Sequence, residues 1–447
     1  MTKLNYLYTF LLISNSLVLG QTNPIITSWL QNTTGITGRH YLNGNPTPII
    51  DAALANIQTV QYSPNWVYVT TQGVPSFITG PFFANPNTVI TATNAIYKFP
   101  LNPTQNLGTP IFTGAGNIGI FKNGVGLFSY GDGFSYNPAT NSDAPTGGAI
   151  WRRDAVKAEI IGFDCSKAHP AAQGNYHHHQ NPSAFNFDLI QLSTICNLYS
   201  SDGLYTINPS EHSPLLGFAY DGFPIYGAYA YTNGIDDSNG VSRMKSSYQL
   251  RNITARTHYA DGTDVVDGPA INTNFPLGWY REDYEYIVHS NDPTYLDEHN
   301  GRFCKTPEYP NGIYCYFTTV DENYNSTYPY AVGPTYYGVK SAVKVTLITE
   351  NTVSYTTLNT NDFINKDFKV IIAPNPSQDF IAIQTQTTEN DLNVELIDEL
   401  GKVVKTTKIL QGSTLSIVET DNIYNGIYFI RISSKNEVKS YKIIIKK

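Results

Sequence analysis

The sequence predicts a mainly β protein, with a large β-rich domain followed by a small C-terminal β-sandwich. Charged residues make up only 14% of the chain, whereas 33 Tyr, 34 Gly and 26 Pro favour strands and turns. The helical period is nearly absent from residues 21 to about 160. Residues 1–360 carry the entire net charge of −8, whereas residues 361–447 are neutral. This change in composition indicates a separate C-terminal domain.

Residues 1–20 read as an export signal. Lys3 supplies a positive start, a short apolar run extends from Tyr6 to Leu19, and residues 19–21 offer a cleavage point. The run is too short to span a bilayer, and no later segment approaches the roughly 20 apolar residues of a membrane helix. We therefore expect an exported chain with no transmembrane segment. The acidic balance, with no basic run, argues against nucleic acid as a partner.

The large domain is expected at residues 21–348, beginning with a series of short strands separated by turns. The β-branched and aromatic runs that predict these strands are residues 60–62, 66–69, 95–99 and 118–121. Residues 185–192 fit a strand or a short helix equally well. Residues 232–275, rich in Gly, Asn, Ser and Asp, read as exposed loops.

Four of the nine histidines lie within residues 169–179. In a strand, His177 and His179 would share one face and His178 would take the other, because strand side chains alternate. The connection 170–174 could bring His169 alongside, which would give three imidazoles, a number typical of open transition-metal sites. A His-rich solvent-facing strand or a hydrogen-bonded polar core would explain the same spacing without a metal.

Two later segments hold further candidate site residues. Residues 212–227 begin with His212 and read as a buried hairpin, in which Asp221 is either the turn residue or a carboxylate facing the histidines. Asp297, Glu298 and His299 could serve as metal ligands or as a general acid and base. Because a strong Asn-Gly turn pair follows at residues 300–301, a simple turn is the alternative for these three residues.

The four cysteines fit two disulfides in an exported chain. Cys304 and Cys315 flank a segment rich in turn residues that can fold back as a hairpin, so we favour this pair. By elimination, Cys165 would join Cys196 and close a loop around the histidine triplet. Thiolate ligation of a metal is the rival interpretation.

The tail at residues 367–447 follows a polar linker expected at residues 349–366. It contains no His, Cys or Trp and reads as seven regularly spaced strands, which is typical of a small sandwich. The strands are expected at residues 370–372, 380–383, 394–397, 403–404, 415–417, 427–432 and 442–445.

The tail resembles the C-terminal sorting domain of the type IX secretion system found in Bacteroidetes. The residues that carry the resemblance are Pro374, Asn375, Pro376, Gly401, Gly426, Tyr428 and the basic end at Lys446 and Lys447. The resemblance implies contact with the type IX machinery and passage across the inner and outer membranes, followed by release or attachment to the cell surface.

The body resembles the YHYH domain family over roughly residues 60–340. The matching blocks include residues 123–124, 132–136, 174–179, 212–217, 221–227, 296–302 and 333–338. The name-giving motif has His178 at its third position where the family has Tyr, whereas His177 and His179 stand in place. The resemblance implies a fold and a location rather than a reaction.

Three functions compete at this point. The first is an extracellular metal-binding domain for Zn or Cu, with His177, His179 and His212 as first-choice ligands and His169 and His299 as reserves. The second is a secreted hydrolase in which His179 or His212 acts with a carboxylate, although no nucleophile elbow or zincin spacing is present. The third is a surface adhesion or carbohydrate-binding module that uses tyrosine faces and the loops at 232–275.

Overall fold

The computed structural model divides the chain into two compact units, Met1–Thr357 and Leu358–Lys447, which we describe separately. The expected export signal and residues 185–192 lie outside the described residues. The structure describes residues 22–82, 90–145, 150–171, 173–183, 196, 198–199, 203–341, 343–356, 370–385, 391–399, 401–434 and 438–447.

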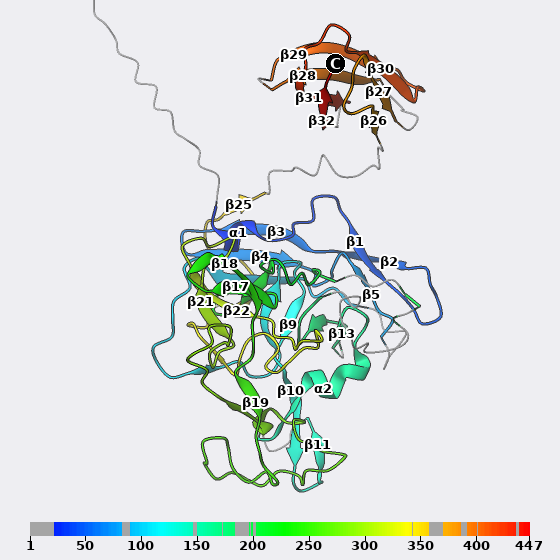
Figure 1. Ribbon diagram of the computed structural model, residues 1–447. Coiled ribbons are helices and arrows are strands. Elements are labelled where there is room, and N and C mark those ends of the chain that lie inside the picture. The colour runs from blue at the N-terminus through cyan, green and yellow to red at the C-terminus, as the bar shows by residue number, and fades with distance from the viewer. Residues whose placement is uncertain are drawn as a thin grey trace, which may run out of the picture. The chain divides into compact units, whose positions relative to one another are not determined.

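Two sheets dominate the first unit, which is mainly β as predicted (Figure 1). The larger sheet has the order β13-β14-β9-β8-β15-β16-β22-β21 and the smaller has the order β24-β6-β4-β3-β25. The bounds in the larger sheet are β13 Ala168–Pro170, β14 Tyr176–His178, β9 Gly126–Phe128, β8 Asn117–Phe121, β15 Leu215–Ala219, β16 Pro224–Tyr226, β22 Ile313–Phe317 and β21 Gly301–Cys304. Those in the smaller sheet are β24 Val343–Val345, β6 Ala95–Pro100, β4 Trp66–Thr71, β3 Ile57–Tyr62 and β25 Val353–Tyr355.

The main hydrophobic core is formed by side chains from both sheets. Val60, Val69 and Phe99 come from the smaller sheet, and Ile120 and Phe218 from the larger one; all five are essentially inaccessible to solvent. β6 alternates buried and half-buried residues, as expected for a strand with one face in the core, whereas every residue of β15 is buried. The shared core fixes the position of the larger sheet.

Smaller sheets and short helices complete the first unit. Their strands are β1 Thr37–His40, β2 Ile49–Leu54, β5 Ile78–Thr79, β7 Ile111–Phe112, β10 Gly131–Asn137, β11 Ser142–Ala144, β12 Arg152–Asp154, β17 Tyr229–Asn233, β18 Asp236–Arg243, β19 Tyr248–Leu250, β20 Tyr284–Tyr286 and β23 Thr335–Tyr336. The helical segments are α1 Pro24–Thr27, α2 Ala155–Glu159, η1 Ile160–Gly162 and η4 Arg281–Asp283. Figure 1 shows α2 close to β13, at the outer edge of the larger sheet.

The described residues of the second unit form seven strands in two sheets, with the orders β26-β27-β30 and β29-β28-β31-β32. Its core includes Ile381, Ile383, Val394 and Ile430. Each of the seven predicted tail strands corresponds to one strand of the structure. They are β26 Ile371–Ala373, β27 Phe380–Gln384, β28 Leu392–Asp398, β29 Val403–Ile409, β30 Leu415–Glu419, β31 Gly426–Ser433 and β32 Val438–Ile445.

Two segments differ from the sequence-based expectation. Val353–Tyr355, within the expected linker, form β25 and pair with β3 of the first unit. Residues 232–275, expected as exposed loops, contain the whole of β18 and also Arg256, which is 1% exposed and pairs with the buried carboxylate of Asp283 at 2.7 Å. Composition missed this because a polar segment can enter the interior when its charges are paired.

The predicted Cys304–Cys315 disulfide is not formed, and both residues are buried thiols. The two strands form a hairpin as expected, but Cys304 pairs with Ile313 and Cys315 with Arg302. The cysteines are therefore diagonal neighbours. The two thiols nevertheless interact, and the neighbouring Cys315 lowers the pKa of Cys304, but no bond joins the sulfur atoms. The other predicted pair, Cys165–Cys196, is joined.

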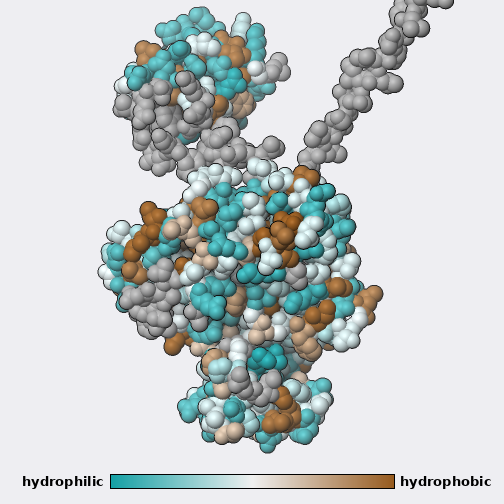
Figure 2. Space-filling model, turned by 180° about the vertical axis from the view of Figure 1, so that it is seen from behind, coloured by the Kyte–Doolittle hydropathy of each residue, from teal (hydrophilic) through white to brown (hydrophobic). Residues whose placement is uncertain are grey.

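The surface of the first unit mixes polar and apolar residues. On the face shown in Figure 2, small hydrophobic groups are separated by hydrophilic and neutral residues. Within the described part of the chain, no helix has the length and apolar character needed to cross a membrane.

Candidate metal centre

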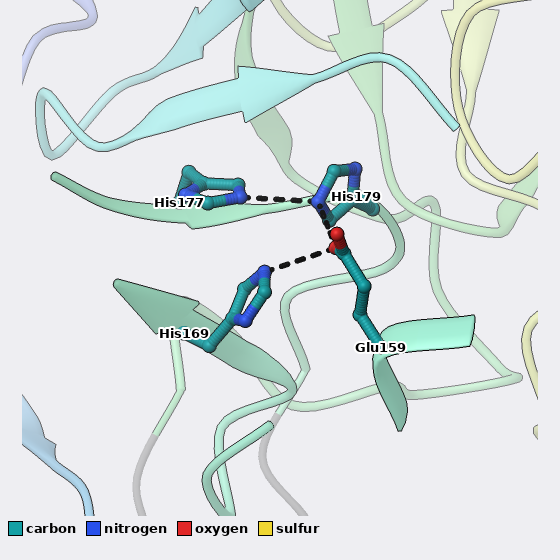
Figure 3. A group of neighbouring side chains, drawn as sticks. All are labelled: Glu159, His169, His177 and His179. Atoms are coloured by element: carbon teal, nitrogen blue, oxygen red, sulfur yellow. Dashed lines mark hydrogen bonds and ion pairs between the residues drawn. The ribbon is translucent and has the colours of Figure 1, made fainter. Parts of the chain in front are cut away.

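Three imidazoles and one carboxylate converge beside the edge strand β13. One ligand atom from each of Glu159, His169, His177 and His179 lies within 4.8 Å of the others. The Nε2 atoms of His177 and His179 are 3.0 Å apart. Glu159 Oε2 is 3.0 Å from His179 Nε2 and 3.1 Å from His169 Nε2 (Figure 3). No other group of this kind occurs among the described residues.

The β13–β14 hairpin places the histidines on one face of the sheet. His169 is directly opposite His177 in the antiparallel register, and their ring centroids are 4.6 Å apart. His179 lies two residues after His177, so the alternation of side chains directs it to the same side. His178 points to the other face, where its ring packs against Phe121 at 5.5 Å.

Backbone carbonyls fix two of the imidazole rings. Nδ1 of His177 donates to the carbonyl of Asn175 at 2.9 Å, and Nδ1 of His179 donates to the carbonyl of Ser129 at 2.7 Å. Since a carbonyl can only accept, each Nδ1 must carry the proton. In the neutral ring the lone pair is then on Nε2, which faces the centre of the cluster.

Helix α2 contributes the carboxylate of Glu159. Asp154 caps this helix by accepting from the Val156 amide at 3.0 Å, and the Ala155 amide donates to the carbonyl of Tyr130 at 2.7 Å. Tyr130 directly follows Ser129, the residue that accepts from His179. One short segment therefore positions both the helix and an imidazole.

The cluster is enclosed on the histidine side and more open on the carboxylate side. The side chains of His179, His169 and Glu159 are 5%, 15% and 24% exposed. Phe128 stacks on the His177 ring with centroids 3.9 Å apart, and Phe163 meets the His169 ring edge-on at 5.0 Å. Among the described residues of the cluster, Glu159 is therefore the most accessible to solvent.

Burial and the neighbouring charges shift the titration of the cluster. Burial, reinforced by the adjacent His179 and His169, lowers the pKa of His177 well below its usual value. Burial raises the pKa of Glu159, but interactions with the His169 and His179 imidazoles outweigh it and hold the pKa below the ordinary range. Glu159 is therefore a carboxylate and His177 a neutral base at neutral pH.

His212, predicted as a first-choice ligand, is not part of this group. Its ring packs against Tyr231, with centroids 4.8 Å apart, and against Tyr226. Nδ1 contacts the carbonyl of Ser213 at 2.7 Å, and burial lowers the pKa of His212 to about 4. Spacing alone could not reveal this position because it depends on how distant strands pack.

His299 and its acidic neighbours form a turn outside the group. Nδ1 of His299 lies 2.8 Å from the Thr335 hydroxyl. Asp297 accepts from the amides of His299 and Gly301, both at 3.0 Å, and Glu298 is exposed. These residues form the simple turn that the sequence offered as the alternative to a metal or acid–base site.

Asp221 is a buried turn residue. Its carboxylate accepts from the Tyr316 hydroxyl at 2.6 Å, the Gly338 amide at 2.8 Å and the Phe223 amide at 3.2 Å. Burial raises its pKa to about 6. With these three donors in place, Asp221 supports the hairpin and is not directed at the histidine cluster.

Glu159 is the member of the cluster that the sequence reasoning missed. It lies in a five-residue helix inside a region that reads as strands and turns. The available signal was local: Asp154 precedes Ala-Val-Lys-Ala-Glu, an N-cap residue followed by good helix formers.

Comparison with known proteins supports both resemblances, although no curated protein matches the sequence. The solved structure of PorZ, described as "an essential bacterial surface component of the type-IX secretion system" of Porphyromonas gingivalis, is 11% identical. The alignment covers 91% of this chain and 53% of PorZ, so the chain spans about half the length of PorZ, and the TM-score is 0.15. This likeness carries no structural argument.

Family models account for both parts of the chain. Residues 371–446 match the secretion system C-terminal sorting domain, which directs the protein through type IX secretion to the cell surface or the extracellular space. Residues 96–329, more than half of the chain, match the YHYH protein model. The chain therefore belongs to the YHYH protein family.

Proposed function

We propose that the first unit is an extracellular metal-binding domain that holds one Zn²⁺ or copper ion through His169, His177, His179 and Glu159. The single observation that carries the proposal is the convergence of three Nε2 atoms and one carboxylate oxygen within 4.8 Å. Imidazole-dominated sets with a carboxylate suit these metals.

The spacing of the donors fits a metal ion. Four ligands at bond lengths of about 2.0–2.1 Å around a tetrahedral centre lie about 3.3–3.4 Å from one another. The nitrogen and oxygen atoms of the cluster are separated by 3.0 Å at the closest and 4.8 Å at the most. The ideal separation lies within this range.

The polar atoms of the cluster lack adequate partners within the protein. Glu159 Oε2 and His169 Nε2 are buried and have no hydrogen bond of good geometry, although they are 3.1 Å apart. The inward-facing nitrogens of His177 and His179 are both lone-pair donors when the rings are neutral. One proton can be shared by only two of these atoms. A metal cation can bind the three imidazole nitrogens and the Glu159 oxygen at the same time.

The hydrolase alternative receives less support. Of the three carboxylates considered as its acid or base, Asp221 and Asp297 are engaged by hydrogen bonds in turns, and Glu298 is exposed outside the histidine cluster.

The deciding experiment measures the metal content of the purified protein by elemental analysis after equilibration with Zn²⁺ or Cu²⁺ and removal of excess ion. We expect about one ion per chain in the wild type and a loss of bound metal in the His177→Ala, His179→Ala double variant. The matched control is His212→Ala, which removes a half-buried histidine outside the cluster and should retain the ion. Equal metal content in the wild type and the double variant would overturn the proposal.

A further inference from the structure

Asp164 is a buried carboxylate with four hydrogen bonds, close to the metal centre but outside it. Its exposure is 1%. Oδ1 accepts from the amides of Ser166 at 2.9 Å and Ala168 at 3.2 Å. Oδ2 accepts from the amide of Gly80 at 2.9 Å and from the Tyr176 hydroxyl at 2.9 Å. Both oxygens are thus occupied by donors from three separate segments.

Two of the four donors, Ala168 and Tyr176, lie in the two strands that carry or adjoin the proposed ligands. Ala168 immediately precedes His169 in β13, and Tyr176 immediately precedes His177 in β14. The amide of Asp164 also donates to the carbonyl of Ala168 at 2.8 Å, which closes the turn before β13. One carboxylate therefore joins the positions adjacent to two of the three imidazoles.

Asp164 acts from the opposite face of the hairpin. Tyr176 and His178 point to the back of β14, whereas His177 and His179 point to the front. The Tyr176 ring is fully buried between Phe77, at 6.3 Å, and Phe82, at 6.1 Å. This packing holds the Tyr176 side chain in place. The hydrogen bond from its hydroxyl to Asp164 therefore limits movement of β14 along the turn that precedes β13.

Phe163, the residue before Asp164, packs on the face of the hairpin that carries the histidines. Phe163 contacts the His169 ring edge-on at 5.0 Å and lies 6.2 Å from the His179 ring. A change in the backbone at Asp164 would move this ring against two ligands. Cys165, the next residue, is tied to Cys196 by the disulfide.

We infer that Asp164, through Tyr176 and the turn 164–168, is a positioning residue that sets the spacing of His169 and His177 for metal binding. This inference rests on the proposed metal-binding function. Residues outside the ligand set that orient the ligands commonly change metal affinity by about 10- to 100-fold when they are replaced.

The test uses the full chain, stripped of metal by chelation and titrated with Co²⁺, whose visible absorption reports the coordination geometry. The variants are Asp164→Asn and the milder Tyr176→Phe, which removes only the hydroxyl. We expect both variants to bind Co²⁺ about 10-fold or more weakly than the wild type and to give an altered visible spectrum, with near-ultraviolet circular dichroism that still shows a folded chain.

The chain offers a closely matched control at Asp221. This carboxylate is also fully buried, and it accepts from a tyrosine hydroxyl and two amides, but it lies outside the metal-binding hairpin. Asp221→Asn and Tyr316→Phe should leave the Co²⁺ affinity and spectrum within about twofold of the wild type. Equal losses in both pairs would show a general effect of destabilisation and would overturn the positioning role.

The outcomes separate the inference from the function on which it rests. If the wild type binds Co²⁺ and folded Asp164→Asn and Tyr176→Phe bind it with unchanged affinity and spectrum, the positioning role is refuted and the metal site stands. If the wild type does not bind Co²⁺, Zn²⁺ or Cu²⁺, the metal site itself is refuted and the positioning role fails with it. If Asp164→Asn does not fold, Tyr176→Phe decides.

Discussion

His169 and His177 face each other as a directly opposed pair across the β13–β14 hairpin, and their ring centroids are 4.6 Å apart. Register sets this relationship, because a slip by one residue would send His177 to the back of the sheet and bring His178 forward. The precision of the metal centre therefore depends on the features that hold the hairpin in register.

The first prediction concerns the turn of this hairpin. Gly174 has a φ of +82°, and a Cβ added there would lie 2.3 Å from Thr91 Oγ1. We expect Gly174→Ala to lower the free energy of unfolding by about 2–5 kcal/mol, from backbone strain and overlap together. The control is Gly240→Ala, where φ is +75° and the space is open, so only about 1–2 kcal/mol should be lost. Denaturant unfolding measures both, and equal losses would contradict the steric argument.

The second prediction concerns the start of helix α2. The Tyr330 hydroxyl donates to Asp154 Oδ2 at 2.5 Å, and both residues are buried. Tyr330→Phe leaves the carboxylate one donor short, so we expect a loss of about 1–3 kcal/mol in unfolding free energy. Tyr248→Phe serves as the control in the same aromatic cluster, because that hydroxyl donates to a carbonyl near the surface and its loss should cost about 1 kcal/mol or less. A larger effect at Tyr248 would count against this account.

The third prediction is a pH dependence at Asp221, whose pKa is raised to about 6 by burial. The folded state binds a proton between the unfolded pKa of about 3.9 and the folded value, so the stability associated with that proton is present at low pH and is lost as pH rises through 6. Asp221→Asn has no such titration.

The measurement is the difference in unfolding free energy between the wild type and Asp221→Asn from pH 4 to pH 7. We expect the difference to shift against the wild type by about 2 kcal/mol over this range, since each pKa unit corresponds to about 1.4 kcal/mol and part of the titration lies below pH 4. A difference that is independent of pH, or that changes in the opposite direction, would show that Asp221 is not held as described.

The fourth prediction concerns the cysteines. Because Cys165 and Cys196 are joined whereas Cys304 and Cys315 are free thiols, two thiols per chain should react with a thiol reagent after unfolding without reductant. Reduction before unfolding should raise the count to four. A count of zero without reductant would show that the second predicted disulfide forms after all.

Local sequence patterns predicted the parts of the fold and of the candidate site that depend on neighbouring residues. Alternation predicted that His177 and His179 share a face, and His169, expected alongside them, lies directly opposite His177. The tail strands were recognisable because each is a separate apolar run bounded by polar turns.

The remaining parts depend on long-range packing. His212 packs against Tyr231 and is not part of the histidine cluster. The periodicity of the sequence does not indicate how far His212 lies from the β13–β14 hairpin. Glu159 enters the cluster because the Tyr130 carbonyl and the Asp154 cap fix the start of a short helix. The thiols at Cys304 and Cys315 were misjudged because a hairpin could be recognised whereas its register could not.

The outermost strand of the larger sheet contains a proline, Pro170 of β13. An exposed strand edge invites a strand from another molecule, which is a common route to aggregation. Proline has no amide hydrogen to offer such an incoming strand, and β13 is only three residues long. The edge that carries His169 is thereby a poor template for the addition of a strand from a second molecule.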